Sequence, residues 1–246
     1  MNQTIIQAKG IEKSFGQLKV LKGIDFSVNR KEVVSIVGAS GAGKSTLLYM
    51  LSGMDKPSLG KVNYCGEDIT DMSITDRARK GIGFAFQQPV RFKGITVREL
   101  LCLAKGGVAT EDELSEVLAN VGMEASAYLD REVDTHLSGG EIKRIEIATV
   151  LMRNSKLIVF DEPEAGIDLW SFNSLIRVFE ELRDQRKCSM IIISHQERIL
   201  SIADEIALIQ DGSVGLHGSR SIMFPLICKN DCDDCDTCYV KEKGEN

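Results

Sequence analysis

The stretch Val33-Val34-Ser35-Ile36-Val37-Gly38-Ala39-Ser40-Gly41-Ala42-Gly43-Lys44-Ser45-Thr46 decides the fold of this chain. A short β-branched run ends in a glycine-rich turn that opens a helix, which fits the pattern Gly-x4-Gly-Lys-Ser/Thr in its required context. Glycines let successive backbone N–H groups point into one concavity, and the first helical turn adds unpaired donors and the positive end of its dipole. The alternative is a tight strand-to-helix turn without a ligand.

We expect this loop to hold phosphate groups. Lys44 would reach the terminal phosphates, and the Ser45 hydroxyl would complete a magnesium shell. The residues expected to contribute are Gly38, Ala39, Ser40, Gly41, Ala42, Gly43, Lys44, Ser45 and Thr46.

Composition bounds the class of protein. The 246 residues are 43% hydrophobic and 27% charged, which is ordinary for a globular protein of one large domain. A net charge of −6 argues against a nucleic-acid partner. No apolar run approaches the roughly 20 residues of a membrane span. The start Met1–Thr4 lacks the features of a signal peptide. We therefore expect a cytoplasmic protein without direct membrane insertion.

Apolar strands alternate with helices along the chain, which indicates a parallel sheet covered on both faces. β-leaning segments at 4–15 and 20–28 precede the loop. A helical insertion is expected at about 89–137, where Thr96–Glu99 and Thr110–Glu113 both fit a capping box. Asp211-Gly212 is a two-residue hairpin signal. The predicted fold class is α/β, as a single domain over 1–246 with a cysteine-rich tail at 228–246.

Polar residues follow three of the predicted strands, at the edge where ligands of parallel sheets bind. Asp161 and Glu162 follow the strand at 157–160. We expect Asp161 to help hold magnesium, because a carboxylate removed from water needs a metal or donors. Glu162 would orient or deprotonate an attacking water. The alternative is the start of a solvated loop.

Gln87 and His195 also end strands. Gln87 would bridge magnesium and the attacking water, and His195 can donate to a phosphate oxygen. Phe15 lies in a turn upstream of the loop and is either a base-stacking aromatic or a core residue.

The order of these motifs resembles the ATP-binding subunit of the ABC (ATP-binding cassette) family over nearly the whole chain. Leu137-Ser138-Gly139-Gly140-Glu141 matches the ABC signature. A capping box would explain Ser138 and Glu141 but not the two glycines, which cost up to about 1 kcal/mol each in a helix. The remaining matches are Walker A at 38–46, the Q-loop at Gln87, Walker B at 157–162, the D-loop at 165–168 and the switch residue His195.

The resemblance implies a P-loop NTPase fold with an N-terminal antiparallel β part, and ATP and magnesium as cofactors. It also implies hydrolysis of ATP by a dimer that forms on ATP. Ser138, Gly139 and Gly140 would contact the γ-phosphate held by a second copy, and Asp168 would join the ATP site. Phe15 takes the position of the base-stacking aromatic.

Within the family, three stretches are similar to the SufC-type ATPase of iron–sulfur cluster assembly: 84–90 with Gly94, Lys143-Arg144-Ile145-Glu146, and 162–168. This likeness implies a SufB-like scaffold as partner, docked at residues 87–103. The alternative is an ATP-binding subunit of a membrane transporter. A third reading, a metal-binding accessory protein with a degenerate ATPase site, conflicts with the intact Lys44, Asp161, Glu162 and His195.

The tail carries Cys228, Cys232, Cys235 and Cys238 within eleven residues. Four thiolates at this spacing suffice for a zinc ion or an iron–sulfur cluster. The aspartates between them would repel an anionic cluster and suit a cation in transit. The alternative is four unligated thiols.

Overall fold

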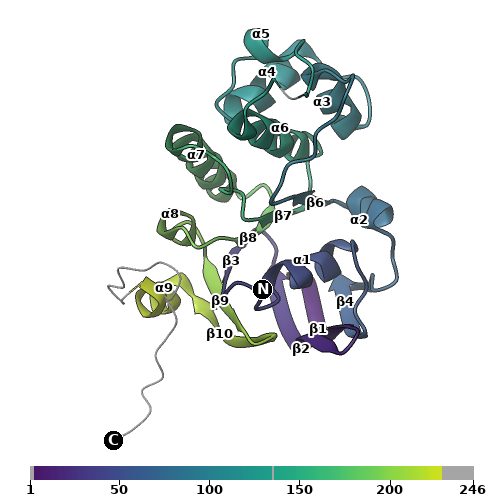
Figure 1. The fold of residues 1–246 in the computed structure, drawn as a ribbon, viewed down its shortest axis with the longest axis vertical. Helices are drawn as coiled ribbons and strands as arrows, with labels where there is room; N and C mark the ends of the chain where they lie inside the picture. Colours follow the sequence, from purple (N-terminus) through teal and green to yellow (C-terminus); the bar gives the residue numbers. More distant parts are fainter. Residues whose placement is uncertain (1–2, 135, 229–246) are drawn as a thin grey trace, which may run out of the picture.

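The computed structural model describes residues 3–134 and 136–228. Its centre is a six-stranded sheet in the order β10-β9-β3-β8-β7-β6 (Figure 1). β3, β6, β7, β8 and β9 are parallel to one another, and β10 runs antiparallel to β9. Their bounds are β3 Val33–Val37, β6 Ile82–Ala85, β7 Leu157–Asp161, β8 Ser189–Ile193, β9 Glu205–Gln210 and β10 Ser213–Ser219.

The turn between β9 and β10 is the predicted Asp211-Gly212 hairpin. Asp211 has φ 47° and Gly212 has φ 78°. Both values are positive, as a type I′ turn requires. The hairpin prediction is therefore confirmed.

Alternating side chains of β3 enter two separate cores. Val33 and Val37 pack with the helices on one face of the sheet, whereas Val34 and Ile36 pack on the other. Successive side chains of a strand point to opposite faces, so a strand buried on both sides is expected to be apolar on both. This explains why four of the five residues of β3 are apolar, with the small Ser35 buried between them.

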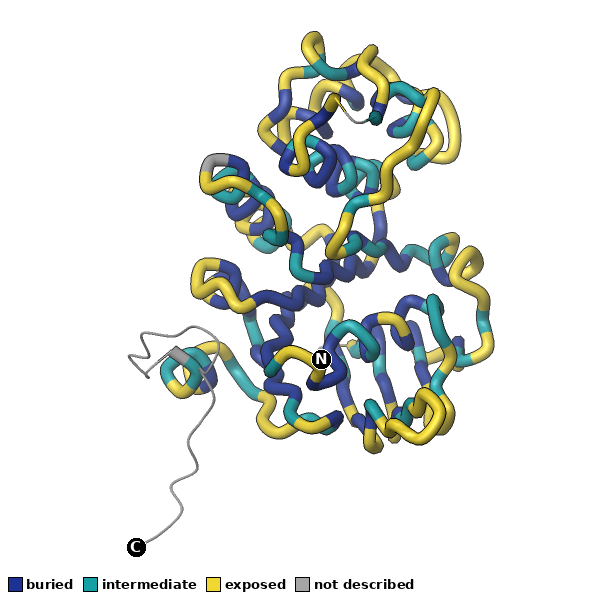
Figure 2. Tube along the Cα trace, viewed as in Figure 1, coloured by how far each residue is buried: buried dark blue, intermediate teal, exposed yellow. Residues whose placement is uncertain are grey.

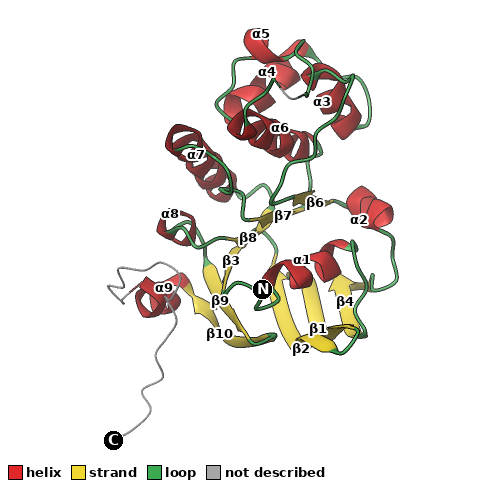
Figure 3. Ribbon diagram, in the orientation of Figure 1, coloured by secondary structure: helices red, strands yellow, loops and turns green. Residues whose placement is uncertain are grey.

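A second, antiparallel sheet has the order β2-β1-β4-β5. It consists of β1 Thr4–Phe15, β2 Leu18–Asn29, β4 Leu59–Tyr64 and β5 Glu67–Asp68. Helix α1 (Lys44–Ser52) buries Leu47, Leu48, Met50 and Leu51 in the core that this sheet shares with the six-stranded sheet. The helix that follows the phosphate loop is thereby held between two sheets (Figure 3).

A helical lobe stands at the far end of the six-stranded sheet from the antiparallel part (Figure 1). It comprises α3 (Val97–Lys105), α4 (Glu111–Asn120), α5 (Ala125–Tyr128) and α6 (Gly139–Met152). Thr96 with Glu99 and Thr110 with Glu113 form the two predicted capping boxes. Helix α6 packs against α3 and α4 and also reaches β6, so it joins the lobe to the sheet.

Four further helices complete the described chain: α2 Ile74–Lys80, α7 Leu169–Gln185, α8 Glu197–Leu200 and α9 Arg220–Cys228. Strands β3, β7 and β8 of the central sheet are buried along their whole length (Figure 2). Among the described residues, no helix has the length and hydropathy needed to cross a membrane. The predicted α/β class, with an antiparallel N-terminal part and a mostly parallel sheet, is confirmed.

Candidate functional site

The turn between β3 and α1 has glycine where no side chain fits. A Cβ at Gly38 would lie 2.2 Å from the backbone oxygen of Ile209. Gly43 is the N-cap of α1 with φ 102°, and a Cβ there would lie 2.7 Å from Cδ2 of Leu21. The loop is therefore pressed against β9 and β2, and glycine is needed for the close approach as well as for the backbone angles.

Lys44 lies inside the loop. Its Nζ donates to the carbonyl oxygens of Gly38 at 2.6 Å and Ala39 at 2.9 Å. Burial lowers the pKa of Lys44, and the carboxylates of Glu162 and Asp161 oppose this shift. The ammonium group is thus held at the concave side of the loop, where terminal phosphates would lie in a P-loop.

Ser45 and Asp161 meet across the start of α1 and the end of β7. The Ser45 hydroxyl donates to Oδ1 of Asp161 at 3.1 Å, and Asp161 is only 1% exposed. Burial raises the pKa of this carboxyl, and the Ser45 hydrogen bond is the main opposing influence. A hydroxyl and a carboxylate beside a phosphate loop are hard oxygen donors, which fits magnesium.

Glu162 and Gln87 face each other from the ends of β7 and β6. Gln87 Nε2 donates to Glu162 Oε2 at 2.6 Å. Glu162 has φ 43°, a left-handed conformation that costs an ordinary residue roughly 1–2 kcal/mol. The backbone N–H of Glu162 donates to the carbonyl oxygen of Ile193 at 3.1 Å. Among the described residues, five other non-glycine residues, including Asp211 of the hairpin, share this left-handed conformation, so the assignment of Glu162 rests on its contact with Gln87.

His195 lies two residues after the end of β8. Partial removal from water lowers the pKa of its imidazole, Lys44 lowers it further, and Glu162 raises it. The residue before it, Ser194, is fully buried and donates to Oε1 of Glu164 at 2.5 Å. The charges of Lys44 and Glu162 are therefore close enough to His195 to influence its pKa.

The signature residues begin α6. Ser138 and Glu141 form the capping box, and the hydroxyl of Tyr128 also donates to Glu141, at 2.6 Å. A Cβ at Gly140 would lie 3.2 Å from Oδ2 of Asp168. Close packing against the D-loop is therefore a reason for glycine at 140 within the single chain, separate from the expected contact with a phosphate.

Asp168 lies directly before the first residue of α7. Its Oδ1 accepts from Ser171 N at 3.0 Å, and its Oδ2 accepts from Ser171 Oγ at 2.6 Å. Gly139 lies close to the backbone of Gly166, with 3.4 Å between its would-be Cβ and that carbonyl oxygen. The signature and the D-loop thus form one packed unit.

Phe15 is 52% exposed, and Nζ of Lys13 lies 5.0 Å from its ring centroid. The core alternative for this residue is therefore wrong, and base stacking stays a prediction. A cavity of about 410 Å³ lies on the outer side of the phosphate loop, lined by Ala39–Ala42, Leu18–Val20, Lys22 and the 210–212 turn.

Two charged residues in the interior, Lys143 and Glu146, were not assigned to the site from the sequence. Both contact the backbone of Phe86, directly before Gln87. Their spacing of three along α6 was a signal that they share a helix face. Their burial could not be inferred, because it depends on a segment some 57 residues away.

The predicted tail ligands lie almost wholly beyond the described chain. Cys228 is the last residue of α9, and Cys232, Cys235 and Cys238 are outside the described residues. Within residues 3–134 and 136–228, the structure contains no cluster of three or more His, Cys, Asp or Glu residues suited to a metal ion.

Comparison with known proteins defines the class. The sequence model of the ABC transporter family matches residues 21–165. The chain belongs to this family, and it is an ATP-binding, ATP-hydrolysing subunit.

Among its relatives is an uncharacterised ABC transporter ATP-binding protein of Methanocaldococcus jannaschii, 39% identical over 92% of each chain. A putative hemin import ATP-binding protein of Staphylococcus haemolyticus is 38% identical over 86% of this chain and 99% of its own. A solved ATP-binding cassette of an ABC transporter, in its ADP conformation, superposes with a TM-score of 0.78 at 28% identity, over 91% of this chain and 94% of that one. These names favour the transporter alternative over the expected iron–sulfur assembly.

Proposed function

We propose that this chain is the ATPase subunit of an ABC transporter, in which two copies close around ATP and pass the motion to a membrane partner. The observation that carries the proposal is the meeting of the phosphate loop, the Ser45–Asp161 pair and the Gln87–Glu162 pair at the carboxyl ends of β3, β6 and β7. Ligands of parallel sheets bind at this edge.

The chemistry is positioning and charge stabilisation. Backbone N–H groups of the loop and Nζ of Lys44 bind the β- and γ-phosphates. Ser45 and Asp161 would hold magnesium, which when bound neutralises phosphate charge. Glu162 orients the attacking water and takes its proton, and Gln87 holds the Glu162 carboxylate in place. His195 donates to a γ-phosphate oxygen.

The signature completes the site in the partner copy. Ser138 and Gly139 are exposed at the N-terminus of a fourteen-residue helix, where backbone donors and the helix dipole attract anions. Asp168, packed against Gly140, would set the distance between the two copies. ATP then joins one copy's loop to the other copy's signature.

The membrane partner would dock at residues 87–103, on the helical lobe. Val90, Phe92 and Leu103 are exposed there, although apolar. The relatives named above are ATP-binding proteins of transporters, which supports a membrane component as the partner. We place the chain in the cytoplasm, on the ATP side of the membrane.

Iron–sulfur assembly on a SufB-like scaffold is the second candidate. The specific observation in its favour is that Lys143 and Glu146, which carry the SufC likeness, contact the backbone of Phe86, the residue before Gln87. The stretch that carries the likeness therefore lies beside Gln87.

Affinity purification of the native complex tests both candidates. A polytopic membrane protein bound to the chain supports transport, and a β-rich scaffold without membrane spans supports assembly. Phe92→Asp should abolish the association, while Val108→Asp, exposed on the same lobe outside 87–103, should leave it intact. Equal recovery with both variants would contradict the docking site.

A further inference from the structure

Two side chains of α6 hold both backbone polar groups of Phe86. Oε1 of Glu146 accepts from the Phe86 N–H at 2.8 Å, and Nζ of Lys143 donates to the Phe86 carbonyl. Lys143 Nζ and Glu146 Oε2 are 3.0 Å apart. The three groups form a closed arrangement between the helical lobe and the end of β6.

The ion pair is removed from water. The side chain of Lys143 is 1% exposed and that of Glu146 is 12% exposed. Burial raises the pKa of Glu146, and Lys143 is the main opposing influence. A buried ion pair seldom adds net stability over apolar residues of similar volume, because desolvation offsets the attraction. Stability alone is therefore a weak reason for this pair.

The pair bonds to a residue that lies directly beside Gln87. Phe86 lies between the last residue of β6 and Gln87, whose side chain bonds Glu162 at 2.6 Å. The ring of Phe86 packs on Phe84, with centroids 4.9 Å apart. Phe86 is therefore held twice: its backbone is bonded to two side chains of α6, and its ring packs on Phe84 of β6. These contacts also fix the position of the next residue, Gln87.

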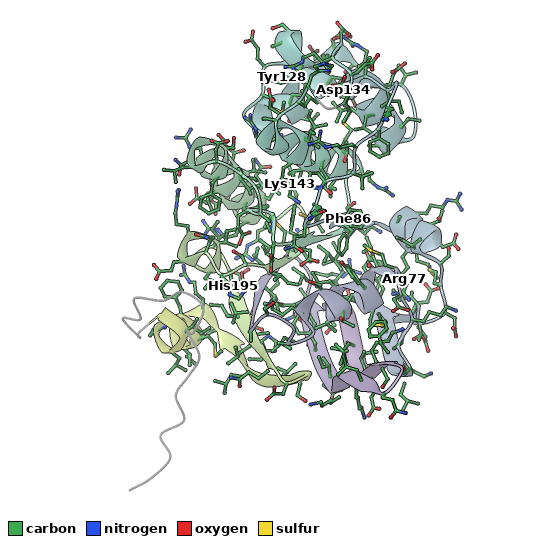
Figure 4. The ribbon with its side chains drawn as sticks, in the orientation of Figure 1. Arg77, Phe86, Tyr128, Asp134, Lys143 and His195 are labelled. Atoms are coloured by element: carbon green, nitrogen blue, oxygen red, sulfur yellow. The ribbon has the colours of Figure 1, made fainter. Side chains whose placement is uncertain are left out.

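The N-terminal end of α6, directly before this pair, is the signature. Lys143 lies one helical turn after Gly139 and Gly140. Because a helix moves as a rigid element, a displacement of Ser138–Gly140 moves the two groups that grip Phe86. Figure 4 shows Lys143 and Phe86 at the junction of the lobe and the sheet.

We propose that Lys143 and Glu146 are positioning residues that set Gln87 against Glu162 through the backbone of Phe86, so that the place of the signature helix controls the hydrolytic geometry. This proposal rests on the role given above to Gln87. The pair does not touch the reacting atoms in this arrangement. It acts through Gln87.

The test is a double-mutant cycle on kcat with Gln87→Ala. K143M/E146L replaces the pair by apolar residues of similar volume. It should lower kcat about tenfold or more, since small misplacements of positioning groups have effects of up to about a hundredfold. The affinity for ATP, measured with a fluorescent analogue, should change less than kcat. In the Gln87→Ala background the same double substitution should cause no further loss.

A charge-reversed variant tests whether an ion pair at these positions is sufficient, or whether each charge must face its own backbone group of Phe86. K143E/E146K keeps an ion pair but places a carboxylate against the Phe86 carbonyl and an ammonium against its N–H, so it should lose kcat like K143M/E146L. Retained kcat in K143E/E146K would overturn the proposal. The control is K105Q/E113Q, which removes an ion pair of 2.6 Å on the surface of the same lobe and should leave kcat unchanged.

The outcomes also separate this proposal from the proposed function. An unchanged kcat in Gln87→Ala alone overturns the role of Gln87. Suppose that Gln87→Ala lowers kcat and that K143M/E146L lowers kcat by the same factor with and without Gln87→Ala. This result overturns the positioning role alone. If neither pair variant folds, K143M/E146Q replaces them in the same cycle, because it removes both buried charges and the donor to the Phe86 carbonyl while keeping the side-chain volumes: no loss in either background, or equal loss in both, overturns the proposal.

Discussion

Gln87 and Glu162 are joined by a hydrogen bond of 2.6 Å between Nε2 and Oε2, although 75 residues separate them in sequence. They come together because β6 and β7 are adjacent parallel strands, with Ala85 paired to Phe160. The carboxylate is therefore oriented by a neutral donor, which leaves its charge available to a water molecule. This relationship ties the catalytic assignment of Glu162 to that of Gln87.

Replacing Glu162 by Gln should abolish hydrolysis but keep ATP binding. The amide has the same size but cannot take a proton, and loss of a general base typically costs 10²–10⁴-fold in rate. The variant should accumulate as an ATP-bound dimer. Phosphate release measures the loss of hydrolysis, and size-exclusion chromatography with ATP measures the dimer. Glu180→Gln, exposed on α7, is the control. Wild-type turnover in Glu162→Gln would refute the assignment.

Replacing Gly38 by Ala should unfold the loop region. The new Cβ would lie 2.2 Å from a backbone oxygen of β9, which cannot rotate away. We expect the free energy of unfolding to fall by about 3 kcal/mol or more, from overpacking and an unfavourable φ together. Gly41→Ala, with open space around its Cβ, should cost only about 1 kcal/mol. Urea denaturation measures both, and equal costs would contradict the packing argument.

Replacing Arg77 by Met should be strongly destabilising. Its guanidinium is buried in α2 and donates to four backbone carbonyls, those of Met50, Leu51, Thr70 and Met72. Two of them belong to the last turns of α1. Leaving these acceptors without donors should lower the free energy of unfolding by about 3 kcal/mol.

Arg79 on the same helix is the matched control. It is exposed, and its ion pair with Asp76 is a surface contact of 3.4 Å. Such pairs contribute about 0–1 kcal/mol, so Arg79→Met should melt close to the wild type. A similar loss in both variants would show that α2 as a whole, and not the buried guanidinium, is responsible.

The pKa of His195 should lie below its ordinary value near 6.5, because partial desolvation and Lys44 disfavour the charged ring. Glu162 raises this pKa, so Glu162→Gln should lower it further. Since the folded-state pKa is lowered, the unfolded chain binds the proton more tightly, and acidification through the range below about 6.5 weakens folding. NMR titration of the imidazole is the measurement. A value that rises in Glu162→Gln would contradict the assignment.

Substituting Ser for the four tail cysteines tests metal binding at 228–238. After anaerobic reconstitution with iron and sulfide, a bound cluster should give the wild type a visible absorbance that the variant lacks. Zinc should appear by metal analysis in the same comparison. A colourless, metal-free wild type would refute the prediction. ATP turnover should be equal in both proteins, because the predicted ATP site includes none of these cysteines.

Patterns with local causes could be predicted from the sequence. The two capping boxes depend on residues three apart, and the hairpin depends on two residues in one turn. The continuous apolar strands likewise predicted a doubly covered sheet, which the packing of Val33–Val37 confirms. The ends of these strands also gave the positions of Gln87, Asp161, Glu162 and His195.

Features with distant causes could not be predicted. Helix α2 was missed because its seven residues show no apolar face, and it is held largely by the reach of Arg77 into α1. Lys143 and Glu146 look like surface charges in sequence and are buried only because Phe86 lies beside them. The packing of Gly140 against Asp168 likewise requires two helix starts to meet in space.

Strand β3, before the phosphate loop, lies near the N-terminus of the chain, whereas its neighbours in the sheet, β8 and β9, lie near the C-terminus. Val34 pairs with Ile191 on one side and with Glu205 on the other, and Val37 pairs with Leu208. During synthesis the antiparallel sheet of β1, β2 and β4 has all its residues available long before β8 and β9 leave the ribosome. Contacts so distant in sequence form slowly, and domains assemble as their segments emerge. Nucleotide affinity should therefore arise abruptly near the end of translation, so a truncated chain carries the motif without the site.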